Sequence, residues 1–396
     1  MSEPLSGLLV VSLEQAIAAP LATRHLADLG ARVVKVERPG EGDFARHYDA
    51  TVKGQSSHFV WANRSKESVA VDFKTARGRA VLERLVARAD VLVSNLAPGA
   101  MERLGMGASR LRGDHPHLIV CTISGYGTTG PYAARRAYDL LVQCEAGLLA
   151  VTGTEDEPAK VGIAIADIAA AMYAYSGILA ALVARQRTGE GATLDVSMLE
   201  SLVEWMGFPL YYASYGGRSP APSGARHSAI APYGPFCVRD GARVFLGVQN
   251  DREWRRLCLR VLRRPELLTD PRFASNPSRV AHAAELQLII EAALAGDPVD
   301  RVLERLDDAG IASAQMRTVH QVLAHEQLAA RLRWTQVDSP SGPIWALRPP
   351  ALDPLWSVPM RPIPSVGQHT AAIIAELGLD PDDYARDQPA PGPVSD

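Results

Sequence analysis

The sequence predicts an α/β fold, with a parallel, doubly wound, Rossmann-like sheet in a large domain and a smaller α+β domain. The first observation is that short β-rich runs alternate with helix-period segments over residues 1–130, as in stacked βαβ units. The second is length, because 396 residues exceed one small core and suggest two or three units at roughly 150 residues per domain. The third is a break at Gly216 to Pro222 (GGRSPAP), whose Gly and Pro density is typical of a linker.

The elements of the large domain follow in chain order. β-branched and apolar runs predict five strands: Leu8 to Leu13, Ala31 to Val36, Val69 to Phe73, Val91 to Ser94 and Leu118 to Ser124. Between them, helical spacing of apolar residues predicts helices over Pro20 to Leu29 and Thr75 to Ala89. A long apolar helix then stops at Arg187 to Gly191, and Thr193 to Val196 predicts a sixth strand. Another helical run extends to about Tyr215.

The middle of the chain has its own pattern. Two strands, Tyr233 to Phe236 and Val244 to Val248, flank a turn and precede three helices over Glu253 to Leu262, Ala283 to Ala295 and Val299 to Ala309. From Asp338 the chain is again Pro-rich and closes with a short helix, Thr370 to Leu377. We therefore predict a first part of the large domain at 1–215, a small domain with linkers at 216–337, and a return segment at 338–396.

Composition excludes several classes of function. A net charge of -3, with Lys and Arg scattered among acids, gives no field to attract DNA or RNA. The four cysteines form no C-x-x-C pair, so we expect a reducing cytoplasm and no structural metal. The N-terminus has acids at Glu3 and Glu14 and no basic region, which does not fit a signal peptide. We predict a cytoplasmic protein with no nucleic-acid and no membrane partner.

Asp167 is the one charge in the apolar run from Val161 to Ala184 (VGIAIADIAAAMYAYSGILAALVA). A buried ionised group without partners is costly, so such a carboxylate is either satisfied or used. The uncharged stretch Ile168 to Ala184 approaches the lower length limit of a membrane span. Its Ala content and polar interruptions instead favour a fully buried helix of a large core, and Asp167 then lies just before that helix.

The loops after the predicted strands carry turn residues, backbone donors and cations. They are Val36 to Arg46, Ser94 to Gly99 and Ser124 to Gly130. Ligands of doubly wound sheets bind at the carboxyl ends of the strands, and a phosphorylated ligand needs such donors and cations. The chain has neither a G-x-G-x-x-G opening its first helix nor a P-loop, so the common nucleotide sites are not indicated.

Seven ordered motifs together resemble the class III CoA-transferases, the group of formyl-CoA and carnitine CoA-transferases. They are GARVVKVERPG from Gly30, Asn95-x-x-Pro-Gly, ISGYGTTGP from Ile123, Ala137-Tyr-Asp, Val151-Thr-Gly, Ala166-Asp-Ile and Arg187-Thr-Gly-x-Gly. The similarity runs over nearly the whole chain. It implies an interlocked homodimer whose large domains are built from both ends of the chain.

The resemblance also implies site residues. A CoA ester would bind at the strand ends, and the family's catalytic aspartate falls on Asp167. The family's CoA contacts carry over to Ala16, Arg38, Val71, Lys74, Asn95, Leu96, Arg103 and Arg136. The chain departs from the family pattern at Leu96-Ala97, where many members have an aromatic and a basic residue.

The chemistry that this implies is covalent. A carboxylate such as that of Asp167 attacks an acyl-CoA thioester, giving a mixed anhydride and then an aspartyl-CoA thioester, from which an acceptor acid takes CoA. No ATP, metal or tightly bound cofactor is needed, and CoA esters are substrates. The competing structural role is an N-terminal cap of the helix, the commonest use of such an aspartate. The resemblance favours the role of nucleophile for Asp167, and we expect the Asp167 side chain to turn toward the ligand.

Two other functions share these features. The α-methylacyl-CoA racemases have the same fold but pair the aspartate with a histidine, where this chain has Tyr138. A tyrosine with a pKa near 10 is a poor proton carrier at pH 7, which favours transfer over racemisation. A catalytically silent acyl-CoA binding protein is the third possibility.

The substrate acid is predicted from cations. The segment from Ala225 to Tyr233 resembles the loop near the acyl group in relatives that use C4 and C5 dicarboxylates. Arg226 and His227 in that loop, with Arg46, Arg64 and Tyr138 elsewhere, are the candidate substrate residues. A basic surface loop is the alternative for Arg226. The segments Val11 to Ala16 and Phe44 to His47 look most like the succinyl-CoA dependent itaconate, mesaconate or malate transferases. This resemblance implies succinyl-CoA as donor and itaconate, mesaconate or malate as acceptor.

Overall fold

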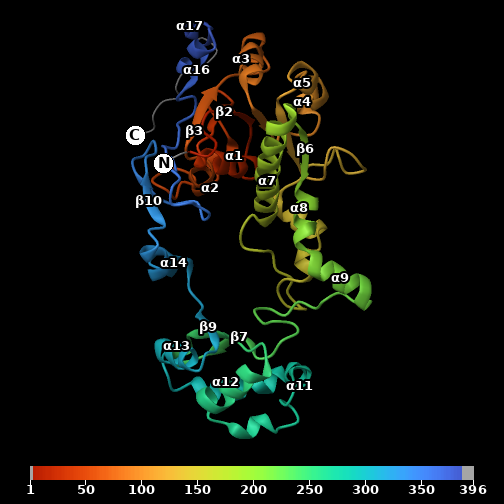
Figure 1. The fold of residues 1–396 in the computed structure, drawn as a ribbon, viewed down its shortest axis with the longest axis vertical. Helices are drawn as coiled ribbons and strands as arrows, with labels where there is room; N and C mark the ends of the chain where they lie inside the picture. Colours follow the sequence, from red (N-terminus) through yellow and green to blue (C-terminus); the bar gives the residue numbers. More distant parts are fainter. Residues whose placement is uncertain (1–2, 386–396) are drawn as a thin grey trace. The chain divides into compact units, whose positions relative to one another are not determined.

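The structure is a computed structural model that describes residues 3–385 (Figure 1). It divides into two compact units, each described by itself. The second unit consists of Gly147–Lys160 and Phe208–Ala329, and the first contains the rest of the described chain. The sequence had predicted boundaries at 216 and 338 and had kept residues 147–160 in the large domain.

The first unit contains a six-stranded sheet in which every neighbouring pair is parallel. The strand order is β3-β2-β1-β4-β5-β6. The strands are β1 Leu9–Leu13, β2 Arg32–Glu37, β3 Lys66–Ala70, β4 Val91–Ser94, β5 Ile119–Ser124 and β6 Thr193–Ser197. This confirms the predicted doubly wound α/β fold, and its order reverses between β1 and β4, where such sheets bind ligands.

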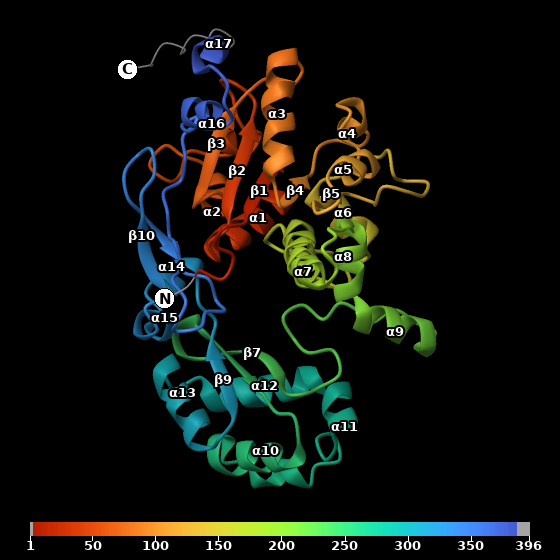
Figure 2. The same ribbon diagram turned by 45° about the horizontal axis from the view of Figure 1, so that its top comes forward.

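Helices cover both faces of this sheet (Figure 2). The core on one face joins Val11 and Leu13 of β1 to α3 (Ala76–Arg88) and α16 (Thr370–Glu376). On the other face α1 (Ala18–Asp28) and α7 (Ile165–Thr188) pack against the strands and against each other. This second face carries Ser12 and Lys35, so polar and charged groups are buried beneath α1.

Shorter elements complete the first unit. They are η1 Phe44–His47, α2 Ser57–Ala62, α4 Ala100–Arg103, α5 Ala108–Asp114, α6 Asp139–Glu145, α8 Met198–Trp205, the hairpin β10 Trp334–Val337 with β11 Ile344–Leu347, and α17 Pro381–Ala385. Helix α15 (Glu326–Ala330) belongs to the second unit except for its last residue. The predicted helical run to Tyr215 is two helices, because it breaks at Met206 between α8 and α9 (Gly207–Gly216).

The third strand begins earlier than predicted. The apolar run predicted a strand over Val69 to Phe73, but β3 starts at Lys66 and ends at Ala70. Its first residues are charged or polar and are nevertheless buried or half-buried, because Lys66 bonds to Glu14 at 2.6 Å. Beyond the strand, Asp72 accepts the Lys74 and Thr75 amides and forms the turn into α3.

Helix α7 corrects two expectations. It starts at Ile165, with Ala164 in the cap position, so Asp167 lies in its first turn and not before it. The helix is also not fully buried, because Met172, Tyr173 and Val183 are exposed. Among the described residues it is the one helix long and apolar enough to cross a membrane, with mean hydropathy 1.6. In the structure it packs on α1, β5 and β6.

The second unit has an antiparallel sheet in the order β7-β8-β9. Its elements are β7 Tyr233–Cys237, η3 Arg239–Gly241, β8 Arg243–Gly247, α10 Asp251–Arg256, the π-helical turn η4 Leu257–Leu262, η5 Pro265–Leu268, α11 Asn276–Ala281, α12 Ala283–Leu294, α13 Val299–Asp308, β9 Ala312–Gln315 and α14 Val319–Leu323. A separate apolar core holds the sheet against the helices. The middle of the chain is therefore an α+β unit, with the predicted helix at 253–262 split between α10 and η4.

Candidate active site

Two helix N-termini meet at Asp167. Helices α1 and α7 run in the same direction, because Ala18 contacts Asp167 at their starts and His25 contacts Tyr175 two turns further on. Buried alanines line both helices, which lets their backbones approach closely. The Asp167 carboxylate accepts a hydrogen bond from the Ala18 amide, the first residue of α1. It therefore lies near the positive ends of two helix dipoles.

Asp139 provides the side-chain cap that the sequence had offered as the alternative role of Asp167. Its Oδ1 accepts the Ala166 amide of α7 at 2.8 Å, and its Oδ2 accepts Gln143 Nε2 at 2.7 Å. Residue 164, in the cap position, is an alanine without a capping side chain. Since Asp139 satisfies the amide in the first turn, the Asp167 side chain is free to face Ala18.

The surroundings of Asp167 oppose its ionisation. Burial and, after it, the neighbouring Asp139 carboxylate raise the pKa of Asp167, the Ala18 hydrogen bond lowers it, and the net result is a pKa of about 7. A carboxyl group with that pKa is about half ionised at pH 7. Perturbation by burial and a like charge is common at functional sites, so Asp167 is the strongest catalytic candidate of this unit.

Two tyrosines belong to the segments around Asp167. Burial, followed by the electrostatic effects of Asp43, Asp167 and Tyr138, raises the pKa of Tyr48 to about 12, so Tyr48 lies in the neighbourhood of these three side chains. Tyr138 precedes α6 and is 65% exposed. Sequence reasoning missed Tyr48 because it follows η1 in a segment with no periodic pattern. The only signal was its place next to the Phe44 to His47 run.

The turn after β1 is hydrogen-bonded to the loop after β4, across the point where the strand order reverses. Gln15 donates its amide to Asn95 Oδ1 at 2.9 Å, and Asn95 Nδ2 donates to the Gln15 carbonyl at 2.7 Å. Ala16 follows with φ 62°, a left-handed conformation that is unfavourable for a residue with a Cβ. Asn95 thus supports the turn and keeps one N–H and one lone pair for other contacts.

The four cations predicted to hold CoA all lie on exposed loops or helix ends of the first unit. Arg38 follows β2 and pairs with Glu41 at 3.2 Å in an exposed bridge, which is weak enough for the guanidinium to change partner. Arg103 donates to the Pro98 carbonyl at 3.4 Å. Lys74 and Arg136 are also exposed. The charges are therefore accessible to an anionic ligand.

The two apolar residues predicted to contact CoA differ in accessibility. Val71 is 4% exposed and belongs to the core, so its side chain offers almost no surface to a ligand. Leu96 is half-buried and borders two hollows. The smaller hollow, of about 30 Å³, lies at the ends of β1 and β2 beside Arg38. The larger hollow, of about 810 Å³, lies between strands β4 to β6 and the short helices α4 and α5. The larger hollow is lined mainly by small and apolar residues, among them Met101, Met106 and Leu194.

Arg46 and Arg64 do not fit the predicted role of binding a substrate acid. Arg46 bonds Glu37 through two nitrogens at 2.9 and 2.7 Å, donates to the Pro364 carbonyl and stacks on Phe59. Arg64 is 3% exposed and makes a two-point ion pair with Asp28 at 2.8 and 2.6 Å. Both guanidinium groups are committed to structural carboxylates, and we withdraw them from the candidate substrate residues.

Arg226 and His227 lie in the second unit, in the loop before β7. Arg226 is exposed beside a cavity of about 40 Å³. The His227 ring stacks on Tyr233 with centroids 5.3 Å apart, and its Nδ1 accepts the Ala229 amide at 3.1 Å. With Nδ1 as the acceptor, Nε2 is the ring nitrogen that can donate a hydrogen bond.

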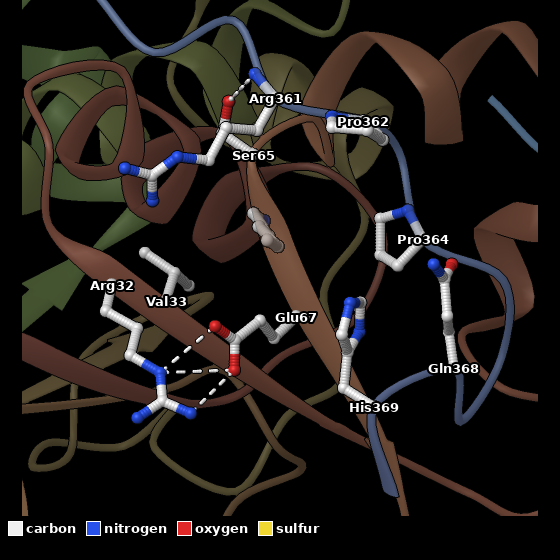
Figure 3. A pocket seen from close by; sticks show the side chains of 10 residues that line it. Arg32, Val33, Ser65, Glu67, Arg361, Pro362, Pro364, Gln368 and His369 are labelled. Atoms are coloured by element: carbon white, nitrogen blue, oxygen red, sulfur yellow. Dashed lines mark hydrogen bonds and ion pairs between the residues drawn. The ribbon is translucent and has the colours of Figure 1, made fainter. Parts of the chain in front are cut away.

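Another cavity, of about 180 Å³, lies at the opposite ends of the strands (Figure 3). It is bordered by the starts of β2 and β3 and by residues 361–369. Arg32 points along one side and is paired with Glu67 at 2.8 Å, while His369 and Gln368 line the other side. None of the predicted site residues belongs to it, so we do not assign it to the candidate active site.

Comparisons with known proteins agree with this geometry. A family model described as CoA-transferase family III matches residues 5–370. The chain is 38% identical over 330 residues to the acetyl-CoA:oxalate CoA-transferase of Acetobacter aceti, covering 83% of this chain and 84% of that protein. It is 33% identical over 379 residues to the succinyl-CoA:glutarate CoA-transferase of Mus musculus, covering 95% and 86%. Among solved structures, a CAIB/BAIF family protein from Brucella suis superposes with a TM-score of 0.86 at 35% identity, covering 95% of this chain and all of that one.

Proposed function

This chain belongs to CoA-transferase family III, and from that membership we propose that it moves CoA from succinyl-CoA to a C4 or C5 dicarboxylic acid. Itaconate, mesaconate and malate are the proposed acceptors. The observation that carries the proposal is the position of Asp167, a carboxylate at two helix N-termini that is not used to cap its own helix. The chain is a CoA-transferase, and its substrates are CoA thioesters.

The proposed reaction begins with attack of an Asp167 oxygen on the succinyl thioester carbonyl. The C–S bond breaks, CoA leaves as a thiolate, and a mixed anhydride remains. The thiolate then attacks the aspartyl carbonyl, the C–O bond to succinate breaks, and Asp167 becomes a CoA thioester. The acceptor carboxylate repeats both steps in reverse order, so Asp167 is regenerated and one thioester has replaced another.

The geometry around Asp167 supports a nucleophile. Attack requires the ionised carboxylate, which the Ala18 hydrogen bond and the two helix dipoles favour against burial. An oxyanion forms on the attacked carbonyl in each step and needs fixed N–H donors. The glycine-containing loop from Gly125 to Gly130 is our proposed source, because it follows β5 at the same edge of the sheet.

CoA binding is proposed at the carboxyl ends of the strands. Arg38, Lys74, Arg103 and Arg136 are accessible cations for the phosphates. The missing aromatic at Leu96-Ala97 leaves the adenine without a stacking partner there. The hollow of about 810 Å³ beside Leu96 is apolar enough to take the base by dispersion contacts instead.

The dicarboxylate acceptor is proposed from Arg226 and His227. A guanidinium can pair with a distal carboxylate through two bonds, and His227 can donate from Nε2 while Nδ1 accepts the Ala229 amide. The names of both relatives above include a dicarboxylic acid, oxalate in one and glutarate in the other. Acids of different length are therefore the appropriate panel for testing this chain.

We also propose an interlocked homodimer in the cytoplasm. In the first unit, Leu140, Leu141, Val183 and Trp205 are large apolar side chains that are each at least two-fifths exposed. Exposed apolar side chains mark a contact site with another protein where they gather into one patch. A second copy of the chain is the occupant that the family resemblance implies.

One experiment separates transfer from the competing functions. The protein is mixed with succinyl-CoA and a panel of mono- and dicarboxylic acids, and new CoA esters are identified by mass spectrometry. Hydroxylamine or borohydride trapping then tests for a thioester on Asp167. Exchange that survives Asp167→Ala would remove the covalent mechanism, and CoA-ester binding without exchange of any acid would indicate a silent binding protein.

A further inference from the structure

Asp43 is a carboxylate 1% exposed whose two oxygens hold three different segments. Its Oδ1 accepts the Ala16 amide at 3.1 Å and the Ala45 amide at 2.9 Å. Its Oδ2 accepts Lys35 Nζ of β2 at 2.7 Å. The side chain therefore joins the turn after β1, the start of η1 and the centre of the sheet.

The charge of Asp43 belongs to a compensated buried network. Lys35 lies 3.4 Å from Glu14 Oε1, and Lys66 donates to that same oxygen at 2.6 Å. Lys66 also donates to the Pro20 carbonyl at 2.8 Å in the first turn of α1. Two ammonium groups thus face two carboxylates with no exposed member, and the network anchors the beginning of α1.

Both segments that Asp43 holds continue to Asp167. Ala16, at φ 62°, directly precedes α1, whose Ala18 amide donates to the Asp167 carboxylate. Ala45 lies in η1, which ends just before Tyr48, and Tyr48 is near enough to Asp167 for the Asp167 charge to raise the pKa of its hydroxyl. A residue with a Cβ keeps a left-handed conformation only where surrounding bonds impose it. Asp43 supplies that bond at Ala16.

We propose that Asp43 is a positioning residue for Asp167, because it fixes the turn that presents the Ala18 amide and the segment that presents Tyr48. The proposal rests on the proposed function of Asp167 as nucleophile. Asp43 itself makes no contact with the reacting atoms.

Three possible roles of Asp43 predict different changes in the ionisation of Asp167. If Asp43 positions Ala18, its loss removes a donor from the Asp167 carboxylate and makes ionisation harder. If Asp43 acts only through its negative charge, its loss makes ionisation easier. If its role is only structural, stability falls and the ionisation of Asp167 is unchanged. The other groups that face Asp167 are Asp139 and Tyr48, and neither is altered in these variants.

The test compares Asp43→Asn with Asp28→Asn in the full-length protein. Asp28 is a matched control, because it is also a buried carboxylate in an ion pair, 2.6 Å from Arg64, but it bonds to no part of the turn. We measure kcat and KM for succinyl-CoA against pH, and thermal unfolding. For Asp43→Asn we expect kcat to fall roughly 10- to 100-fold, because a reacting group is misplaced. We also expect the acidic limb of the pH-rate profile to move to higher pH, while KM changes little. For the Asp28→Asn control we expect lower thermal stability and no movement of the acidic limb.

A second measurement reads Asp167 without turnover. Carbodiimide labels protonated carboxyl groups, and mass spectrometry of the peptide containing Asp167 gives its labelling rate against pH. A wild-type protein that labels normally but transfers no CoA would contradict the proposed function alone. An Asp43→Asn profile that is unmoved, or moved to lower pH, would overturn the positioning role.

The double variant Lys35→Met with Asp43→Ser addresses folding. It removes the ion pair as a unit and leaves no unpaired buried charge at this position, since Glu14 keeps Lys66. We expect the same shift to higher pH in both measurements. An unmoved profile in this folded variant also overturns the proposal.

Discussion

Asp139 accepts the backbone amide of Ala166 at 2.8 Å and so caps the helix that carries Asp167. Two adjacent carboxylates thereby divide two tasks. Asp139 satisfies the helix end, and Asp167 faces the start of α1 with a raised pKa.

Replacing Asp139 by Asn is expected to make Asp167 ionise at lower pH. The Asp139 charge raises the pKa of Asp167, after the larger effect of burial, and an amide retains an oxygen for Ala166 without that charge. The acidic limb of the rate profile should move to lower pH. Glu145→Gln, on the exposed side of the same helix, is the control and should leave the limb in place.

Replacing Asp167 by Asn should abolish transfer without destabilising the fold. Loss of a covalent nucleophile costs about 1,000-fold or more in kcat. The folded pKa of about 7 is above the ordinary 3.8, so the native state binds more protons than the unfolded state between those values. Wild-type stability should therefore fall as pH rises from about 4 to about 7, and Asp167→Asn should lack that part of the decline. Thermal unfolding at several pH values checks this, and a large loss of stability at pH 7 would instead indicate a capping role.

Replacing Tyr138 by His should introduce proton exchange. Wild-type protein with a chiral 2-methylacyl-CoA in deuterated water, without acceptor acid, is expected to exchange no α-proton. A histidine 65% exposed beside the site would titrate near neutral pH and supply the second base. Mass spectrometry of the CoA ester measures the exchange. Rapid exchange by the wild type would support a racemase and contradict the transferase mechanism.

Replacing Arg226 by Ala should affect the acceptor acid selectively. We expect KM for a dicarboxylate to rise about 10-fold or more, in the range of a lost charged hydrogen bond, while KM for a monocarboxylate changes little. Arg218→Ala, another exposed arginine of the same unit, is the matched control. Equal effects on both acids would reject Arg226 as a dicarboxylate ligand.

Replacing Arg64 by Met should reduce stability and leave substrate KM unchanged. The variant leaves the buried Asp28 with Arg24 alone, 3.7 Å away, so we expect a loss of about 3 kcal/mol in the free energy of unfolding. Denaturant unfolding measures the loss. A raised KM for the acceptor acid with unchanged stability would restore Arg64 as a substrate residue.

The periodicity of the sequence was sufficient for the parallel sheet and most of its helices. Periodicity did not predict the start of β3, where charged residues are buried. A strand pattern assumes that charged residues are exposed, but Lys66 is buried and bonded to Glu14. Periodicity failed at Arg46 and Arg64 for a related reason. An arginine that binds a substrate and one that is paired with Glu37 or Asp28 look the same in a sequence, and only the folded chain brings the partner carboxylate within reach.

Asp167 illustrates the difference between what the sequence predicts and what the folded structure adds. The amino-acid sequence predicts a lone carboxylate in an apolar run near a helix start, because local composition and helix signals depend on neighbouring residues. The folded chain was needed to show that Asp139 caps the helix and that Asp167 faces Ala18. Those contacts join residues 27 and 149 positions apart in the chain (166 minus 139, and 167 minus 18). Their energies depend on burial and on the packing of two parallel helices, which local sequence does not specify.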